Sequence, residues 1–206
     1  MFADRDEAAI RLAADLGKYR GLKPLVLGIP RGAVPMARVI AGKVAGEVDV
    51  ALVRKLGAPG NPEFAIGAVD ETGWSYVAAH ARNAGADAAY LAQETRAQLE
   101  VLKARRAAYT AIRPAADPQG RIVVVVDDGL ATGATMIAAL HALRARNPAK
   151  LICAVPVAPP ETIEEVSRHC DEMVCLEAPD NFQSVGQFYQ RFEQVSDAEV
   201  VAALRT

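Results

Sequence analysis

The chain has 206 residues, of which 51% are hydrophobic and 23% charged, and its formal net charge is −2. These values are ordinary for one globular domain with a substantial core, and they give no global sign of nucleic-acid binding. The opening stretch is charged and no apolar run reaches the length of a membrane span, so we expect a cytoplasmic protein without membrane association. The cysteines are odd in number and lack a CxxC spacing, which predicts reduced, mostly buried thiols: Cys153, Cys170 and Cys175.

The first pattern along the chain is that of an amphipathic helix. Asp4 and Glu7 resemble a capping box, and apolar residues then recur at helical spacing as far as Leu16. Glycines at 17 and 21 end this helix, which we expect to cover a sheet.

A short apolar strand follows over residues 24–28 and runs into a turn rich in glycine and proline, after which residues 34–44 resume as a helix. Gly28, Arg31 and Gly32 lie at the carboxyl end of this strand. Because parallel sheets collect ligands at the carboxyl ends of their strands, this turn is a candidate anion-binding loop. The alternative is an ordinary connecting loop with an exposed arginine.

Residues 49–56 are predicted to form a third strand, which ends in two adjacent cations, Arg54 and Lys55. Placed beside the other strand ends, these side chains could neutralise a bound anion. A pair of exposed charges without a ligand is the alternative interpretation.

The next segment, residues 54–80, predicts a loop and a hairpin. Residues 57–63 are dense in turn formers and are expected to be a mobile loop, with Glu63 as a possible polar contributor to the site. Residues 64–69 and 74–78 then flank a turn that contains glycine, as in a β-hairpin. Two further side chains here are expected to be structural: Trp74 and His80.

A long helix is predicted over residues 83–113, because this stretch is rich in helix formers and has no internal proline. It has a broken apolar stripe, which suits a dimer contact or a cover over the sheet. The opposite face is basic but carries no interleaved aromatic residues, so a solvated face is favoured over a nucleic-acid arm.

The most informative stretch is RIVVVVDDGLATGATMIAAL, residues 121–140. Residues 122–126 have the composition of a strand buried on both faces of a parallel sheet. Asp127 and Asp128 follow at its carboxyl end, a tight turn comes next, and residues 136–140 resume as a helix.

Such a strand, loop and helix can hold a phosphate. Gly133 and its small neighbours let the backbone close around an anion, while the first N–H groups of the helix and the hydroxyls of Thr132 and Thr135 can donate to it. Asp127 and Asp128 would repel that phosphate, so they suit a neighbouring diol, such as ribose hydroxyls, or a divalent cation. Together these groups indicate a phosphorylated pentose.

Two more strands, residues 151–157 and 172–177, are separated by a helix over 161–169. The fold class is therefore α/β: an open, mainly parallel sheet of five strands flanked by helices, with a hairpin and a small C-terminal lobe. This lobe, residues 179–206, is unusually aromatic. Its aromatic side chains could stack on a flat heterocycle or pack in the core, and both interpretations stay open.

The motif over residues 123–135, VVVVDDGLATGAT, resembles the phosphoribosyl pyrophosphate (PRPP) signature of the type I phosphoribosyltransferases, and it is neither a Walker loop nor a G-x-G-x-x-G fingerprint. Together with GIPRGAVPMA and RKLGAPGNPEFAIGAV, it is similar to a bacterial phosphoribosyltransferase-domain group whose acceptor the motifs do not name. The order of the segments is that family's order along nearly the whole chain.

The resemblance implies roles for these residues. Asp127 and Asp128 would hold the ribose hydroxyls, with Mg²⁺ bound to them indirectly, through those hydroxyls or water. The loop after the first strand would hold pyrophosphate and contain a cis non-proline peptide near Arg31. Residues 54–80 would be the flexible loop. The other implied positions are, for the 5′-phosphate, Ala131, Thr132, Gly133, Ala134 and Thr135; for pyrophosphate, Arg31, Gly32, Arg54 and Lys55; and for the acceptor, Asp180 and Phe182.

The implied function is transfer of the 5-phosphoribosyl group from PRPP to a nitrogenous acceptor, such as a nucleobase, with release of pyrophosphate, by a homodimer. In 6-oxopurine transferases the residue before T-G-x-T is typically an acid, and here it is Ala131. A 6-oxopurine acceptor is therefore less favoured. Two alternatives come from other classes: a PRPP-sensing regulator that binds nucleic acid, which the near-neutral charge disfavours, and a noncatalytic relative that binds a ribose phosphate.

Overall fold

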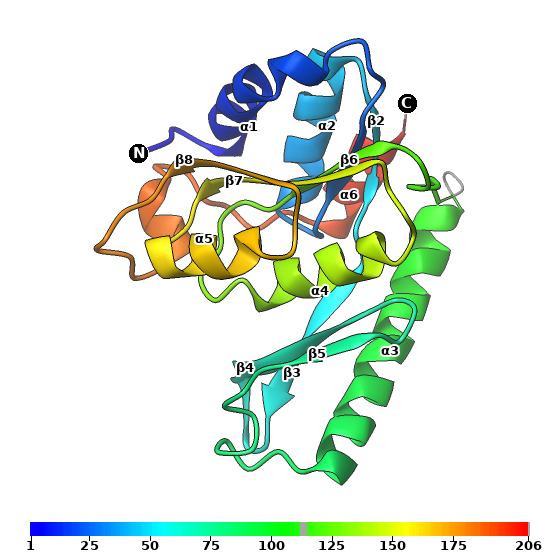
Figure 1. The fold of residues 1–206 in the computed structure, drawn as a ribbon, viewed down its shortest axis with the longest axis vertical. Helices are drawn as coiled ribbons and strands as arrows, with labels where there is room; N and C mark the ends of the chain where they lie inside the picture. Colours follow the sequence, from blue (N-terminus) through cyan, green and yellow to red (C-terminus); the bar gives the residue numbers. More distant parts are fainter. Residues whose placement is uncertain (112–114, 206) are drawn as a thin grey trace.

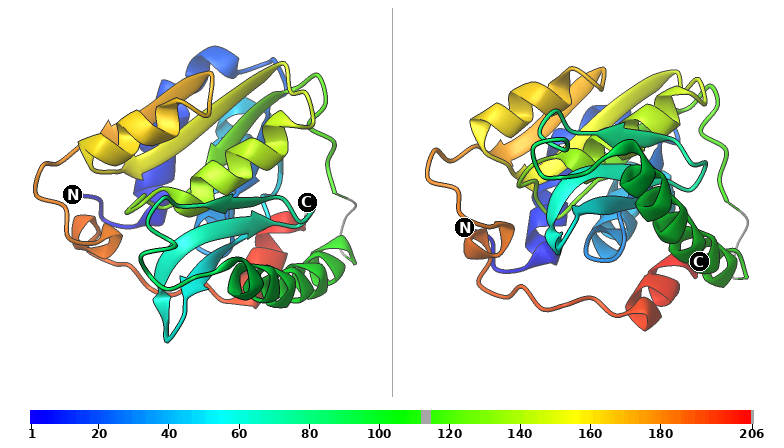
Figure 2. Two further views of the ribbon diagram at one scale, coloured as in Figure 1. Left: turned by 60° about the horizontal axis from the view of Figure 1, so that its bottom comes forward. Right: turned by 90° about the horizontal axis from the view of Figure 1, so that it is seen from below.

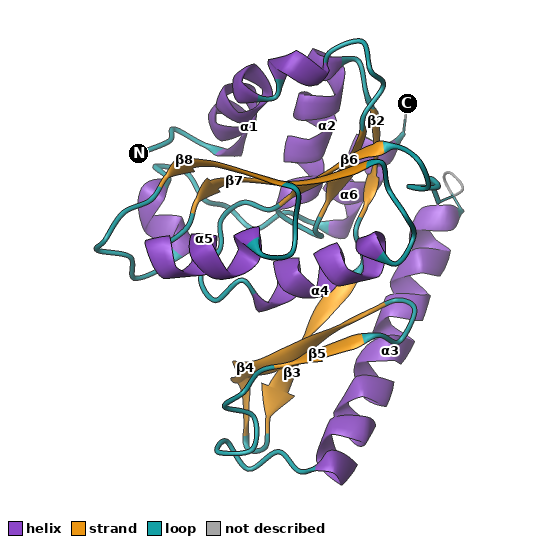
Figure 3. Cartoon of the chain, viewed as in Figure 1, coloured by secondary structure: helices purple, strands orange, loops and turns teal. Residues whose placement is uncertain are grey.

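The structure, a computed structural model, describes residues 1–111 and 115–205. It contains a parallel sheet in the order β2-β1-β6-β7-β8 and a separate antiparallel sheet, β3-β4-β5 (Figures 1 and 3). This confirms the predicted fold class. The strands of the parallel sheet are β1 (Leu25–Gly28), β2 (Glu47–Val50), β6 (Ile122–Val126), β7 (Lys150–Val157) and β8 (Glu172–Glu177).

Helices cover both faces of the parallel sheet, which explains its continuous apolar strands. Val124 and Val126 of β6 pack with helices α1 (Arg5–Asp15) and α2 (Ala33–Val44). Val123 and Val125 point to the other face, against α4 (Ala134–Arg144). The remaining helices are α3 (Ala88–Thr110), α5 (Pro160–Ser167), α6 (Asp197–Leu204) and two short 3₁₀ segments, η1 (Gly17–Tyr19) and η2 (Val185–Phe188).

The expected cap of the first helix is present in modified form. The Asp4 side chain accepts a hydrogen bond from the Glu7 amide at 3.0 Å, and Asp4 is the residue before α1. The Glu7 carboxylate accepts from the Ala3 amide at 2.6 Å, one residue before the position that a capping box would use.

The predicted third strand, residues 49–56, is wrong as a single element. β2 ends at Val50, and after two residues the chain enters β3 (Val53–Ala58) of the antiparallel sheet. The run DVALV contains no glycine or proline to mark this break, and β-branched residues suit either sheet. Arg54 and Lys55 therefore lie in the second sheet rather than at the edge where the parallel strands end.

The predicted mobile loop over residues 57–63 is also corrected. β3 and β4 (Asn61–Asp70) form a hairpin in which Ala58 pairs with Asn61, so only Pro59 and Gly60 turn. Gly60 has φ +73°, which glycine adopts at little cost. The predicted hairpin, over residues 64–69 and 74–78, is confirmed: β4 pairs with β5 (Ser75–Val77).

The predicted long helix is present as α3, which begins at Ala88 and therefore later than predicted. Its predicted end at residue 113 lies outside the described residues. It packs against β3 and β4 (Figure 2). It therefore covers mainly the antiparallel sheet, although Arg106 also pairs with Asp49 of β2 at 3.8 Å. In the part of the chain that the structure describes, no helix is both long and apolar enough to cross a membrane.

The C-terminal lobe returns to the start of the chain. Phe2 forms an isolated parallel bridge with Tyr189, and the Phe2 side chain is completely buried. The lobe then ends in α6, which packs against α2 (Figure 2). The three cysteines are free, as predicted: Cys153 is buried and the other two are partly buried.

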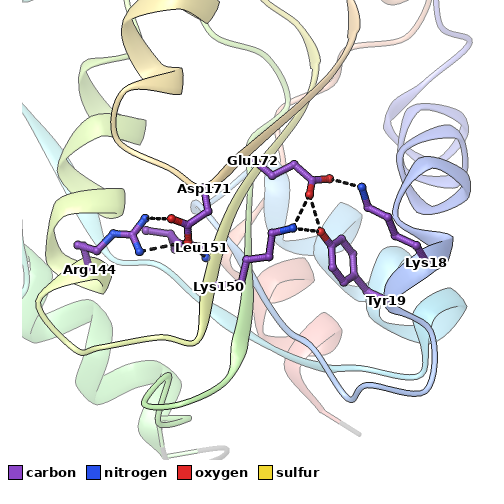
Figure 4. A network of polar contacts seen from close by, with 7 residues as sticks. All are labelled: Lys18, Tyr19, Arg144, Lys150, Leu151, Asp171 and Glu172. Atoms are coloured by element: carbon purple, nitrogen blue, oxygen red, sulfur yellow. Dashed lines mark hydrogen bonds and ion pairs between the residues drawn. The ribbon is translucent and has the colours of Figure 1, made fainter.

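A polar network ties the amino ends of β7 and β8 to η1 (Figure 4). Glu172 accepts hydrogen bonds from Lys150 at 2.7 Å and from the Tyr19 hydroxyl at 2.5 Å, and it pairs with Lys18 at 2.7 Å. Burial alone would raise the pKa of Glu172, but these donors hold that pKa at about 2, against an ordinary 4.5.

This network predicts an acid-sensitive contribution to stability. Glu172→Gln should lower the free energy of unfolding at pH 7 by about 1 kcal/mol, because it removes the charge from a partly exposed ion-pair network. Since the folded pKa is depressed, the stabilisation is present above pH 4.5 and is lost as the pH falls towards 2. Urea unfolding at pH 7 and pH 3 measures it, with Glu164→Gln as an exposed control of smaller effect. A wild-type advantage of equal size at both pH values would contradict this account.

Candidate functional site

Two loops meet where β1 and β6 end. The strands are adjacent and parallel, with Gly28 opposite Val126, and the Ile29 amide donates to the Val126 carbonyl at 3.0 Å. The turn after β1 therefore lies beside the turn after β6. The peptide between Pro30 and Arg31 is cis, as the resemblance predicted.

Asp128 lies directly against the turn after β1. A Cβ atom added to Gly32 would come within 2.1 Å of the Asp128 Oδ2 atom, so only glycine leaves room for this carboxylate. Asp127 precedes Asp128 in the chain, and its Oδ1 atom accepts a hydrogen bond from the Asp128 amide at 2.9 Å. The site thus joins both aspartates to the candidate pyrophosphate loop.

The two aspartates differ in their electrostatic surroundings. Burial and the neighbouring Asp128 charge raise the pKa of Asp127 well above its ordinary value. Burial also raises the pKa of Asp128, but the Arg5 guanidinium opposes this shift. Asp128 is therefore the member of the pair that more readily carries a negative charge.

The loop after the aspartates has the geometry of an anion-binding helix start. Gly133, at φ +73°, precedes α4, whose first-turn N–H groups have no partners within the helix. The hydroxyl of Thr162 in α5 donates to the Ala131 carbonyl at 2.7 Å and fixes the loop from behind. Ala131 and Thr132 are exposed, and Ala134 and Thr135 are partly exposed, so the loop can receive a ligand.

Arg54 and Lys55 do not join this constellation through any described contact. The Arg54 Nε atom donates to Gln98 of α3 at 2.6 Å. The Lys55 ammonium pairs with Glu63 at 2.7 Å, within the β3-β4 hairpin. As neighbours in one strand they point to opposite faces of it. Of the three cations predicted for pyrophosphate, Arg31 is thus the one that lies on the turn beside the aspartates, where it is partly exposed.

The two predicted acceptor residues lie in the tail. Phe182 is partly exposed and stacks on Phe188, with ring centroids 5.4 Å apart, while Asp180 is exposed. Phe188 also packs against the core, as the packing interpretation predicts for that ring. η2 reaches the aspartate loop directly, since a Cβ atom on Gly129 would meet the Val185 side chain at 2.6 Å.

Sequence reasoning missed two residues that contact Asp128. Arg5 donates to its carboxylate from α1, and the Tyr189 hydroxyl donates to its carbonyl at 2.6 Å from the tail. Arg5 carries no motif, because it has the pattern of an ordinary charged residue in a first helical turn. Tyr189 belonged to the aromatic tail that the sequence analysis singled out, but its partner could not be foreseen.

The donor set fits a magnesium ion only with help from a substrate. Within residues 1–111 and 115–205, no group of three or more His, Cys, Asp or Glu side chains could hold a metal. Mg²⁺ commonly keeps several waters and binds one or two carboxylates together with substrate phosphates. Asp127 and Asp128 beside an anion-binding loop match that pattern.

Comparison with known proteins agrees with this geometry. The family model described as a phosphoribosyl transferase domain matches residues 4–192, and the chain belongs to that family. Two curated relatives from Mycobacterium tuberculosis, MT0597 (strain CDC 1551) and Rv0571c (strain H37Rv), are both 42% identical over 99% of the chain. Both are provisionally named phosphoribosyl transferases.

A solved structure, that of TT1426 from Thermus thermophilus, is similar throughout. It is 46% identical, has a TM-score of 0.83, and the match covers 98% of this chain and 97% of that one. The curated relatives are longer, however, and the chain spans 46% of their length.

Proposed function

We propose that this chain transfers the 5-phosphoribosyl group from PRPP to a nitrogenous acceptor and releases pyrophosphate. The observation that carries the proposal is the contact between Asp128 and the turn at Gly32, beside the loop that opens α4. PRPP carries a sugar diol, a 5′-phosphate and a pyrophosphate in one molecule. Three neighbouring subsites of matching chemistry therefore favour it.

The proposed roles follow from the chemistry of each group. Asp127 and Asp128 accept hydrogen bonds from the ribose hydroxyls, and residues 131–135 donate to the 5′-phosphate. Arg31 and the backbone around Gly32 stabilise the pyrophosphate as it leaves. Mg²⁺, when bound at the aspartates through hydroxyls or water, would neutralise part of the pyrophosphate charge. Catalysis is then mainly positioning and electrostatic stabilisation.

Arg54 and Lys55 take a different place in this proposal. They belong to the hairpin and contact Gln98 and Glu63, so the hairpin would have to carry them to the pyrophosphate. Closure of such a segment would also exclude water from the activated ribose. Asp180 and Phe182 remain the proposed contacts for the acceptor.

Pyrophosphate release from PRPP and Mg²⁺, measured across purine, pyrimidine and other nitrogen acceptors, tests this function. We expect release that depends on one acceptor class, and a loss of about 100-fold or more in an Asp127→Asn, Asp128→Asn double variant. Asp15→Asn, an exposed aspartate at the end of α1, is the control and should keep full activity.

The same assay separates the alternatives. PRPP binding without turnover on any acceptor would favour a PRPP-sensing or noncatalytic protein. If calorimetry finds no PRPP binding at all, the proposed function is wrong.

A further inference from the structure

Arg5 makes contacts that ordinary helix capping does not require. From the first turn of α1, its Nε and Nη2 atoms donate to the Asp128 Oδ2 atom at 2.9 and 2.8 Å. Its Nη1 atom donates to the Glu193 carbonyl at 2.7 Å, and its guanidinium lies 3.9 Å from the centre of the Phe192 ring. The side chain is only 14% exposed.

These contacts determine how Asp128 presents its carboxylate. Both donors from Arg5 converge on Oδ2, so they leave Oδ1 to accept from another donor. The Tyr189 hydroxyl holds the backbone carbonyl of the same residue at 2.6 Å. Tyr189 in turn stacks on Phe192, whose centroid is 4.8 Å away. Asp128 is thus fixed from both ends of the chain.

We propose that Arg5 is a positioning residue of the transfer reaction, which orients the Asp128 carboxylate so that Oδ1 receives a ribose hydroxyl. This inference rests on the proposed function. The positioning role goes beyond the proposed function because it links the ribose subsite to the tail that carries the proposed acceptor contacts. One edge of the Arg5 guanidinium contacts Asp128, and the group also contacts the segment at Phe192 and Glu193.

The groups that face Asp128 make Arg5 its cationic partner. They are Asp127 on its own loop, Arg5 from α1 and the Tyr189 hydroxyl from the tail. Loss of Arg5 would remove the cation that contacts this carboxylate and would leave Oδ2 without its two donors.

A purely structural role is the rival explanation, because Arg5 also joins α1 to the tail. Arg11 provides a matched control. It lies on the same helix, stacks over Phe2 at 4.6 Å and pairs with Glu177 at 3.6 Å, and these contacts of Arg11 are away from both aspartates of the site. Arg11→Gln should loosen the contacts of α1 with Phe2 and with the end of β8 without altering Asp128.

The experiment compares Arg5→Gln, Arg5→Lys and Arg11→Gln in the whole chain. Arg5→Gln should lower kcat/KM for PRPP at least 10-fold, whereas Arg11→Gln should leave it unchanged. Arg5→Lys should recover part of this loss, since a lysine keeps the charge but cannot reproduce two N–H bonds from one planar group. Thermal unfolding shows that each variant is folded.

Each outcome decides the matter. An unchanged kcat/KM in Arg5→Gln, or an equal loss in Arg11→Gln, would overturn the positioning role while leaving the transferase proposal intact. A wild-type chain that transfers to no acceptor would overturn both. A loss of kcat/KM in Arg5→Gln that Arg5→Lys does not partly recover would also overturn the role of Arg5.

Discussion

Alanine at position 32 should reduce kcat/KM for PRPP about 100-fold while leaving the protein folded. The Gly32 backbone is helical, with φ −55° and ψ −37°, so alanine meets no backbone restriction there. Its methyl group would instead lie 2.1 Å from Asp128 Oδ2 and 3.2 Å from the Arg5 Nε atom. The carboxylate is the terminal part of a short side chain, so it moves, and the loss falls on activity. A displacement of about 1 Å near reacting groups can cost that much.

Gly42→Ala is the matched control, because Gly42 lies in the same helix and a Cβ atom there meets nothing within 4 Å. It should stabilise α2 by up to about 1 kcal/mol, through helix propensity, and leave kcat/KM unchanged. Steady-state kinetics and urea unfolding of both variants check the pair. Full activity in Gly32→Ala would show that activity does not depend on the position of the Asp128 carboxylate.

Alanine at position 133 should damage both stability and PRPP binding. Gly133 has φ +73°, a conformation that costs other residues roughly 1–2 kcal/mol. A Cβ atom would also meet Val166 at 2.7 Å and Thr162 at 3.1 Å, both on α5. Crowding there adds to the backbone cost, so we expect a total loss of stability of about 3 kcal/mol. Because Thr162 fixes the loop at Ala131, α5 cannot yield without moving the loop, and calorimetry should show at least 10-fold weaker PRPP binding.

Gly60→Ala separates the two contributions. Gly60 has the same φ, +73°, but a Cβ atom there meets nothing within 4 Å. This variant should lose only the stability that the backbone conformation costs, about 1 kcal/mol, and it should bind PRPP normally. If Gly133→Ala and Gly60→Ala lose equal stability and both keep PRPP affinity, crowding by α5 has no role in shaping the phosphate loop.

The sequence predicted the parts of the site that lie close together along the chain. Strand β6, both aspartates and the loop before α4 span one short stretch, whose composition reports burial, charge and turn chemistry together. The five parallel strands could be counted for the same reason. Family membership is confirmed, and the roles of the individual site residues stay predictions.

What the sequence could not reveal depends on tertiary contacts. The boundary between β2 and β3 has no turn residue. It consists of Ala51 and Leu52, whose side chains are both buried. Gly57 and Pro62 look like loop residues but lie in paired strands, where a Cβ atom added to Gly57 would come within 2.7 Å of the Pro62 backbone. Arg5 and Asp128 are 123 residues apart, and no local pattern connects them.

The fluorescence of one residue can report the position of the β4-β5 hairpin. Trp74, the single tryptophan, stacks on His141 of α4 with ring centroids 4.3 Å apart and planes 17° from parallel. Helix α4 is one rigid element of 11 residues, about 16 Å long, that begins at the phosphate loop and lies between the parallel sheet and the hairpin (Figure 1). Indole emission therefore reports, without any label, whether the hairpin is seated on the same helix whose first turn would face the substrate phosphate.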